Sequence, residues 1–153
     1  DYCDPYNPDL YESAFKNGEK GIPINGLIWM GNVDFMKAQL NEKLAQGFRC
    51  IKIKIGVNWE EEYKILKALR SEFSVDQLEL RVDANGGFSF DEAQIVLQQL
   101  DALQIHSIEQ PIKANQIELM AKLCADTPTP IDLDEELLGV FKRDEKYTLF
   151  TQV

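Results

Sequence analysis

The fold is decided by the stretch Arg81-Val82-Asp83-Ala84-Asn85-Gly86-Gly87, which follows a short apolar run and precedes a helical pattern. Residues 78–83 alternate between apolar and polar side chains, as a strand with one buried face does. The segment 85–87 turns the chain. A carboxylate at the carboxyl end of a parallel strand stands where α/β sheets place their chemistry, so Asp83 is the first candidate functional residue.

Two more acids end strand-like runs at matching distances along the chain. Glu109 closes residues 107–109 and Asp134 closes residues 131–134, so the spacings are 109 − 83 = 26 and 134 − 109 = 25. One unit earlier, Lys54 lies in an apolar run with 83 − 54 = 29. These intervals fit one strand and one helix each. A lysine pair and three acids therefore recur at the same point of successive units.

Composition limits the class of protein. The 153 residues are 44% hydrophobic, which predicts one domain with a sizeable core. A net charge of −10 disfavours nucleic acid or an anionic membrane as a partner. No stretch approaches the 18 or so apolar residues of a membrane span. Cys3, Cys50 and Cys124 lack disulfide or zinc spacing, which favours a reducing cytoplasm.

Strand and helix patterns alternate five times along the chain. We expect strands at 22–30, 51–55, 78–83, 105–109 and 131–134, and helices at about 34–46, 60–73, 91–103, 116–124 and 137–150. Gly47 is expected to end the first helix, and Asp91 to cap the third. No two strands are close enough for a hairpin, which predicts a parallel sheet with right-handed crossovers. Residues 1–20 are expected to form a linker from an upstream domain.

Two arrangements fit five such units. One is a complete flavodoxin-like doubly wound sheet, which the length alone favours. The other is part of a (β/α)8 barrel, which typically needs about 250 residues. A doubly wound sheet rarely aims four consecutive strand ends at one point, whereas a barrel does so. We therefore expect an α/β fold in which residues 21–153 form strands 1–5 of a TIM-type barrel, ending before the sixth strand.

The run Ile51-Lys52-Ile53-Lys54-Ile55 alternates strictly. In an edge strand both lysines would simply face water. In a barrel they would point inward while the isoleucines pack on the helices. Two desolvated ammonium groups repel each other, so we expect a lowered pKa for at least one lysine. Such a lysine can serve as a general base near neutral pH.

The three acids offer oxygen ligands that suit Mg²⁺ or Mn²⁺. Any one of Asp83, Glu109 and Asp134 is typical of a solvated strand end, but three in matched places favour a shared site. Asn85 is expected either to orient a ligand or only to make the turn with Gly86. The chemistry indicated is proton abstraction beside a carboxylate, in which the metal stabilises an enediolate while a lysine removes the α-proton.

Four ordered motifs carry a resemblance to a known family: Lys52-x-Lys54, Asp83-x-Asn85, Glu109-Gln110-Pro111 and Asp134-Glu135. With them the chain resembles the enolase superfamily, in its muconate-lactonizing-like branch. Residues 21–31, 81–86 and 134–137 are similar to the o-succinylbenzoate synthase family in particular. The likeness runs from about residue 18 to residue 146.

The resemblance implies a role for each site residue. It implies Mg²⁺ bound by Asp83, Glu109 and Asp134, with Asn85 and Glu135 beside the ligands. It makes Lys54 the proton-abstracting base and Lys52 its electrostatic neighbour. The implied reaction is a dehydration of a small-molecule carboxylate, 2-succinyl-6-hydroxy-2,4-cyclohexadiene-1-carboxylate, to o-succinylbenzoate in menaquinone biosynthesis.

Alternatives remain open at this point. A dipeptide epimerase or N-acylamino acid racemase has the same motifs, and a non-catalytic Mg²⁺-binding flavodoxin-like module belongs to a different class. Without the capping domain and strands 6–8 of this family, the segment alone is expected to be inactive. A homo-oligomer is left open. Asp132 stands where a small or apolar residue is expected, and it either competes for the metal or pairs with Lys52 or Lys54.

Overall fold

The computed structural model describes residues 13–151, which form a five-stranded parallel sheet with helices between the strands. The strands are β1 (Gly26–Ile28), β2 (Cys50–Lys54), β3 (Glu79–Asp83), β4 (Ser107–Glu109) and β5 (Ile131–Asp132). The helices are α1 (Ser13–Lys16), α2 (Val33–Ala45), α3 (Trp59–Glu72), α4 (Phe90–Ala102), α5 (Ile117–Asp126), the 3-10 helix η1 (Glu135–Leu137) and α6 (Arg143–Phe150).

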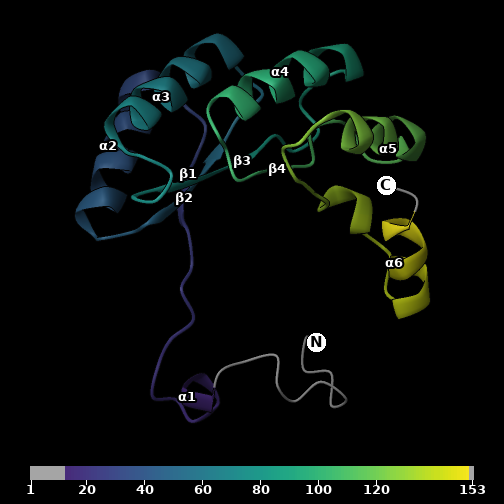
Figure 1. Ribbon diagram of the computed structural model, residues 1–153, viewed down its shortest axis with the longest axis horizontal. Coiled ribbons are helices and arrows are strands. Elements are labelled where there is room, and N and C mark those ends of the chain that lie inside the picture. Colours follow the sequence, from purple (N-terminus) through teal and green to yellow (C-terminus); the bar gives the residue numbers. More distant parts are fainter. Residues whose placement is uncertain (1–12, 152–153) are drawn as a thin grey trace.

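The order of the strands decides between the two predicted arrangements. It is β1-β2-β3-β4-β5, so each strand lies beside the next one in the sequence. Helices α2 to α5 lie in an arc along one face of the sheet (Figure 1). A flavodoxin-like sheet has the order 2-1-3-4-5 and helices on both faces. The sheet is therefore a five-strand arc of a (β/α)8 barrel, as predicted.

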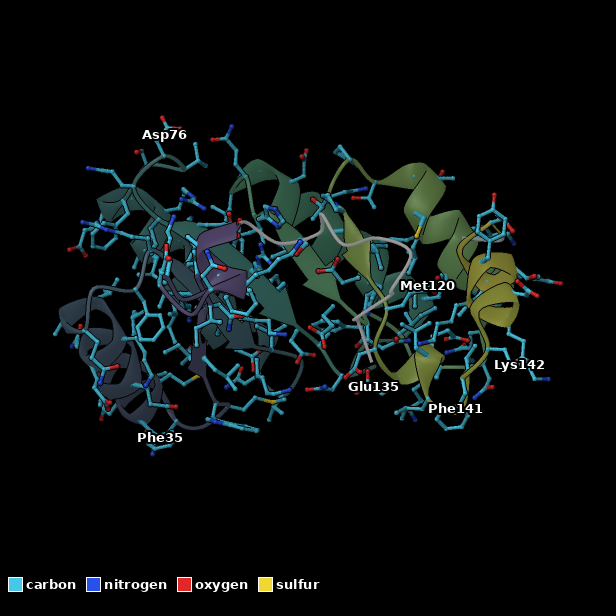
Figure 2. All side chains as sticks on the ribbon, turned by 90° about the horizontal axis from the view of Figure 1, so that it is seen from below. Phe35, Asp76, Met120, Glu135, Phe141 and Lys142 are labelled. Atoms are coloured by element: carbon cyan, nitrogen blue, oxygen red, sulfur yellow. The ribbon has the colours of Figure 1, made fainter. Side chains whose placement is uncertain are left out.

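The core lies between the sheet and this arc of helices. Ile51, Ile53 and Ile55 are at most 1% exposed, and Leu80 and Val82 of β3 are equally buried. The helices contribute buried residues such as Leu66, Leu100 and Met120, the last of which is labelled in Figure 2. Slipping β2 by one residue would turn its lysines onto the helices and its isoleucines to the concave face. The strict alternation of β2 therefore determines which face carries the lysines.

The first strand is shorter than predicted. It covers Gly26–Ile28 rather than residues 22–30. Pro23 has no N–H to donate to a ladder, and Ile24 is exposed. At the other end, the backbone N–H and C=O of Trp29 bond to the side-chain amide of Gln39, at 3.0 and 3.1 Å. That amide takes the place of a strand partner and ends the ladder.

The fifth strand and the C-terminal helix also differ from the prediction. Strand β5 ends at Asp132 because the N–H of Asp134 donates to the side chain of Gln110 instead of a neighbouring strand. The predicted helix 137–150 is divided into η1 and α6. Gly139 between them has φ +84°, in the left-handed region that ends a helix.

The helix ends follow local capping rules. Gly47 ends α2 as predicted: it has φ +85°, its N–H bonds to Leu44 O, and the N–H of Phe48 bonds to Lys43 O. The prediction that Asp91 caps α4 is wrong. Ser89 is the cap, and it exchanges hydrogen bonds with Glu92 in a capping box.

A short four-residue helix, α1, lies within the expected linker, apart from the sheet (Figure 1). Residues 17–25 join it to β1 without regular structure. Residues 1–12 of the expected linker lie outside the described residues.

A buried carboxylate holds the loop between β2 and α3. Glu62 is 3% exposed and accepts the backbone N–H groups of Gly56, Val57 and Asn58 at 2.8, 3.2 and 3.0 Å. These hydrogen bonds are charge-assisted and pair three consecutive backbone donors of this loop with one carboxylate. Because the loop starts directly after Lys54, Glu62 fixes how β2 leaves the sheet.

We expect Glu62→Ala to lower the free energy of unfolding by about 2–4 kcal/mol, since it leaves three loop donors without an acceptor. Urea unfolding followed by circular dichroism measures the loss. The matched control is Glu60→Ala, because Glu60 makes only an exposed ion pair with Lys64 and such pairs contribute about 0–1 kcal/mol. Equal effects of the two substitutions would contradict this role for Glu62.

Candidate active site

Four charged residues form one row across the carboxyl ends of the strands. In the pairing of the strands, Lys54 is the partner of Asp83, Asp83 of Glu109, and Glu109 of Asp132. Neighbouring strands lie about 4.8 Å apart, so adjacent members of this charged row are close. The row lies on the concave face because the residues between these positions, such as Ile53 and Val82, are buried against the helices.

Lys54 is held on three sides. Its Nζ is 2.6 Å from Asp83 Oδ2 and donates to Asn85 Oδ1 at 2.6 Å. The same Nζ lies 5.4 Å from the ring centroid of Trp29, within cation–π range. Asp83 is only 3% exposed, and its other oxygen accepts the N–H of Asn85 at 3.0 Å. The predicted base is therefore aimed by a buried carboxylate and an amide.

Lys52 faces the acid of a different strand. Its Nζ is 2.5 Å from Glu109 Oε2. Burial lowers the pKa of Lys52. The hydrogen bond to Glu109 and the charges of Glu109, Asp83 and Asp132 raise it by more, so the pKa lies above its usual 10.5. The prediction that repulsion between the two lysines lowers the pKa is therefore wrong for Lys52. The acids of β3, β4 and β5 outweigh the loss of hydration that lowers the pKa of this lysine.

Asn85 connects Lys54 of β2 to the loop after β5. Its Nδ2 donates to Glu135 Oε1 at 2.9 Å, while its Oδ1 accepts from Lys54. The other oxygen, Glu135 Oε2, is buried and has no hydrogen-bond partner among the described residues. Figure 2 labels Glu135 beyond the ends of the strand arrows. Glu135 and Lys54 are thus joined through one amide.

Asp134 lies apart from the other predicted ligands. Its side chain is exposed. Within residues 13–151, no three His, Cys, Asp or Glu side chains are grouped so that they would hold a metal ion. The structure therefore brings Lys52, Lys54, Asp83, Asn85, Glu109 and Glu135 together, and Asp134 remains outside this group.

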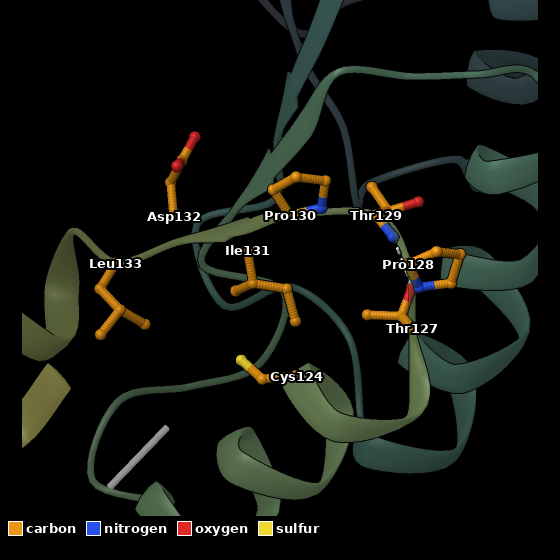
Figure 3. A pocket seen from close by; sticks show the side chains of 8 residues that line it. All are labelled: Cys124, Thr127, Pro128, Thr129, Pro130, Ile131, Asp132 and Leu133. Carbon is orange, nitrogen blue, oxygen red and sulfur yellow. Dashed lines mark hydrogen bonds between the residues drawn. The ribbon is translucent and has the colours of Figure 1, made fainter. Parts of the chain in front are cut away.

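Asp132 projects to the concave side, opposite to Ile131 and Leu133 (Figure 3). Its negative charge helps to raise the pKa of Lys52, although the effects of burial, Glu109 and Asp83 on this pKa are larger. This supports the alternative in which Asp132 pairs electrostatically with a lysine. The residue also lines a groove of about 560 Å³ along β5, with Cys124 and residues 127–133. In the described part of the chain, β5 pairs only with β4, so this groove follows an open strand edge.

Close packing of the loops fixes these strand ends. A Cβ at Gly87 would lie 2.9 Å from Ala84 O and 3.2 Å from Gly56 O, so only glycine fits there. The loops after β2 and β3 therefore touch through their backbones. This contact limits the movement of Lys54 and Asp83 relative to each other.

One residue near the site was missed by sequence reasoning. Gln110 was noted only as part of a motif, yet its side chain is fully buried and bonds to the loop after β5. The only signal in the sequence was a long polar side chain between Glu109, which ends a strand, and Pro111. An exposed glutamine at this position would look the same. Periodicity contains no information about such a contact.

The concave face also has a thiol at the amino end of the sheet. Cys50 Sγ donates to Glu79 Oε1 at 3.3 Å, and Glu79 also pairs with Arg81. Burial, and next the hydrogen bond and charge of Glu79, raise the pKa of Cys50 to about 11. Cys50 and Cys124 are both free.

We expect Cys50 to be alkylated by iodoacetamide at pH 8 about 100-fold more slowly than an unfolded cysteine, because only the thiolate reacts. Peptide mass spectrometry against time gives the rate. Glu79→Gln removes a charge that raises the pKa, so it should accelerate the reaction. A native rate equal to the rate in urea would contradict the raised pKa.

The sequence between residues 35 and 145 matches the family model described as Enolase C-terminal domain-like. This segment covers β2 to β5 and the charged residues of the site, from Lys52 to Glu135. The chain belongs to the enolase superfamily. Its parallel sheet is thus part of the enolase-superfamily barrel.

Two enolase-superfamily proteins of Desulfotalea psychrophila and Thermosynechococcus elongatus are among the most similar. The o-succinylbenzoate synthase of the former is 50% identical over 133 residues, 86% of this chain and 36% of the relative. A crystal structure of MenC from the same species has a TM-score of 0.78 at 45% identity, over 93% of this chain and 39% of that one.

The third comparison is the o-succinylbenzoate synthase of Thermosynechococcus elongatus, described as complexed with Mg in the active site. Its TM-score is 0.67 at 32% identity, over 76% of this chain and 37% of that one. Racemases and epimerases match at 27–41% identity, below the 50% of the Desulfotalea psychrophila synthase. The chain spans about a third of the length of these enolase-superfamily relatives.

Proposed function

We propose that the complete protein to which this chain belongs is an o-succinylbenzoate synthase, a carbon–oxygen lyase. It would dehydrate 2-succinyl-6-hydroxy-2,4-cyclohexadiene-1-carboxylate to o-succinylbenzoate in menaquinone biosynthesis. The observation that carries the proposal is Lys54, held at 2.6 Å by both Asp83 and Asn85 on the charged row. The 50% identity to a synthase of this name supports the choice of substrate.

The residues present fit a Mg²⁺ ion in their chemistry. Asp83 and Glu109 are paired neighbours on adjacent strands, and both supply the hard oxygen ligands that Mg²⁺ prefers. Each now neutralises a lysine, so the site already pairs opposite charges. We propose that Asp83, Glu109 and Asp134 bind the ion. Bound Mg²⁺ would supply positive charge that stabilises charge developing on the substrate carboxylate. Mn²⁺ is proposed as a substitute of the same ligand preference.

Within this site the chain's own residues divide the work. Lys54 would take the α-proton, since Asp83 and Asn85 hold its Nζ at the open concave face. Lys52 would remain protonated, consistent with its raised pKa, and would supply fixed positive charge beside Glu109. Asn85 and Glu135 would hold the orientation of Lys54 through their shared hydrogen bond. Contacts among the described residues support these proposed roles.

The alternatives are less well supported. A flavodoxin-like module has a different strand order from the one observed. A dipeptide epimerase or N-acylamino acid racemase would use the same strand ends, so the choice depends on the relatives, among which the synthase is the more similar.

The proposal also covers the partners, the assembly and the location of the protein. We propose a small-molecule carboxylate as partner, no nucleic acid or membrane, a homo-oligomer as the assembly to be tested, and the cytoplasm as location. No helix in the described chain is long and apolar enough to cross a bilayer. We also propose that residues 1–20 are a linker, that residues 21–153 are the first part of the barrel, and that the segment alone is inactive. The exposed Asp134 supports the inactivity.

Assaying the complete protein tests the function. We expect Mg²⁺-dependent formation of o-succinylbenzoate, which is lost with EDTA and restored by adding the ion. Dipeptides and N-succinylamino acids serve as competing substrates, with racemisation followed by deuterium incorporation. Faster racemisation of either class than dehydration would overturn the proposal in favour of an epimerase or racemase.

A further inference from the structure

Trp29 follows β1 at the carboxyl end of the sheet, next to the proposed base. Its side chain is 56% exposed. A single exposed aromatic residue is common on protein surfaces, but the ring centroid of this one lies 5.4 Å from Lys54 Nζ. The roles proposed above do not use this indole.

The register of β1 and β2 places Trp29 in line with the charged row. Ile28 is the partner of Ile53, and both side chains are buried against the helices. Trp29 and Lys54 each come one residue later, so both side chains project to the concave face. The indole therefore continues the charged row by one position, on the β1 side of Lys54.

The main chain of Trp29 is held independently of its side chain. The side-chain amide of Gln39, on α2, accepts the N–H of Trp29 at 3.0 Å and donates to its C=O at 3.1 Å. Because these hydrogen bonds use only backbone atoms at position 29, a different residue there can keep them. A ring on a backbone that is already fixed loses little freedom when a ligand binds to it.

The chemistry of the proposed substrate brings its ring to this indole. The α-carbon that loses the proton is itself an atom of the cyclohexadiene ring, and a general base approaches to roughly 2.6–3.2 Å between heavy atoms. Stacked rings have centroids about 4.5–7 Å apart. A substrate ring whose α-carbon meets Lys54 Nζ therefore lies within stacking range of the Trp29 ring, which is 5.4 Å from the same Nζ.

We propose that Trp29 is a specificity-determining residue whose exposed indole face stacks on the six-membered ring of the substrate. This inference rests on the proposed function. Dehydration makes the ring flat and aromatic, so o-succinylbenzoate presents a full π face to the indole. The α-carbon of a dipeptide or an N-succinylamino acid is acyclic and brings no ring to this place. Trp29 thus favours a ring substrate over the substrates of the related racemases and epimerases.

Titration calorimetry of o-succinylbenzoate into the complete protein with Mg²⁺ tests this contact. We expect Trp29→Ala to weaken binding about 30-fold, the effect of losing an aromatic anchor at the centre of an interface. Trp29→Phe keeps a ring face and should weaken binding only about 2–10-fold. The matched control is Trp59→Phe, because Trp59 packs on Tyr63 and Phe88 away from the charged row, and it should bind as the wild type does.

Tryptophan fluorescence distinguishes a direct contact from an effect through Lys54. If o-succinylbenzoate stacks on Trp29, its binding should quench the emission of this indole. Trp29→Phe should therefore lose part of the quenching while it still binds the ligand. Trp59→Phe should keep that part.

The outcomes separate this inference from the proposed function. If the wild type binds o-succinylbenzoate and Trp29→Ala binds it equally well, the inference is overturned even where kcat falls, because the indole would then act only on Lys54. Equal weakening by Trp29→Ala and Trp59→Phe, or quenching that Trp29→Phe leaves unchanged, would also overturn it. A wild type that binds no o-succinylbenzoate would instead overturn the proposed function.

Discussion

Replacing Lys54 by alanine in the complete protein should reduce kcat for the dehydration by about 100- to 10,000-fold, because a positioned general base contributes 10²–10⁴-fold. Lys54 is the lysine whose Nζ is held on the concave face by both Asp83 and Asn85. The rate of o-succinylbenzoate formation under saturating Mg²⁺ measures the effect.

Loss of Lys54 also leaves Asp83 buried without its cation, so stability must be separated from catalysis. Lys54→Arg keeps a positive charge near Asp83 but cannot act as a base near neutral pH, since arginine stays protonated. It should therefore be as inactive as Lys54→Ala while melting closer to the wild type. Lys64→Ala, on the exposed side of α3, is the matched control and should retain activity. An active Lys54→Arg enzyme would contradict the assignment of Lys54 as the base.

Asp83→Asn should abolish metal binding and turnover together. The side chain is 3% exposed and keeps its shape in this substitution, but it loses the negative charge that both Lys54 and a divalent ion require. We expect Mn²⁺ affinity to fall at least 100-fold, more than the 10–100-fold typical of residues outside the ligand set. Turnover should fall by a similar or larger factor, and titration calorimetry provides the metal affinity directly.

The control removes one negative charge at an exposed position away from the site. Asp76, labelled in Figure 2, is exposed in the loop before β3, so Asp76→Asn should leave both metal affinity and turnover unchanged. If Asp83→Asn bound Mn²⁺ as tightly as Asp76→Asn, Asp83 would pair only with Lys54 and would not be a metal ligand.

Much of the fold could be predicted because alternation and spacing are local properties of the sequence. The isoleucines of β2 determine which face of the sheet packs on the helices. The similar intervals from Lys54 to Asp83 and from Asp83 to Glu109 predict that these residues lie at the ends of neighbouring strands. Boundaries were less predictable. The backbone of Trp29 is satisfied by the distant side chain of Gln39, and nothing in residues 22–30 reveals that partner.

The site, like the fold, could be predicted only in part from the sequence. The inward direction of Lys52 and Lys54 follows from their alternation with isoleucine, and this prediction is confirmed by the burial of β2. The raised pKa of Lys52 did not follow, because it depends on acids from β3, β4 and β5. The bond between Asn85 and Glu135 joins residues that are 50 positions apart, so it emerges only once the barrel arc has formed.

The location of a bound ion is the most direct test of this account. Crystals of the complete protein grown with Mn²⁺ would show the ion by its anomalous scattering. We predict one Mn²⁺ on the concave face, bound by Asp83, Glu109 and Asp134, with Lys54 and Lys52 beside it. An ion bound by Asp132 in place of Asp134, or no ion at the charged row, would contradict it.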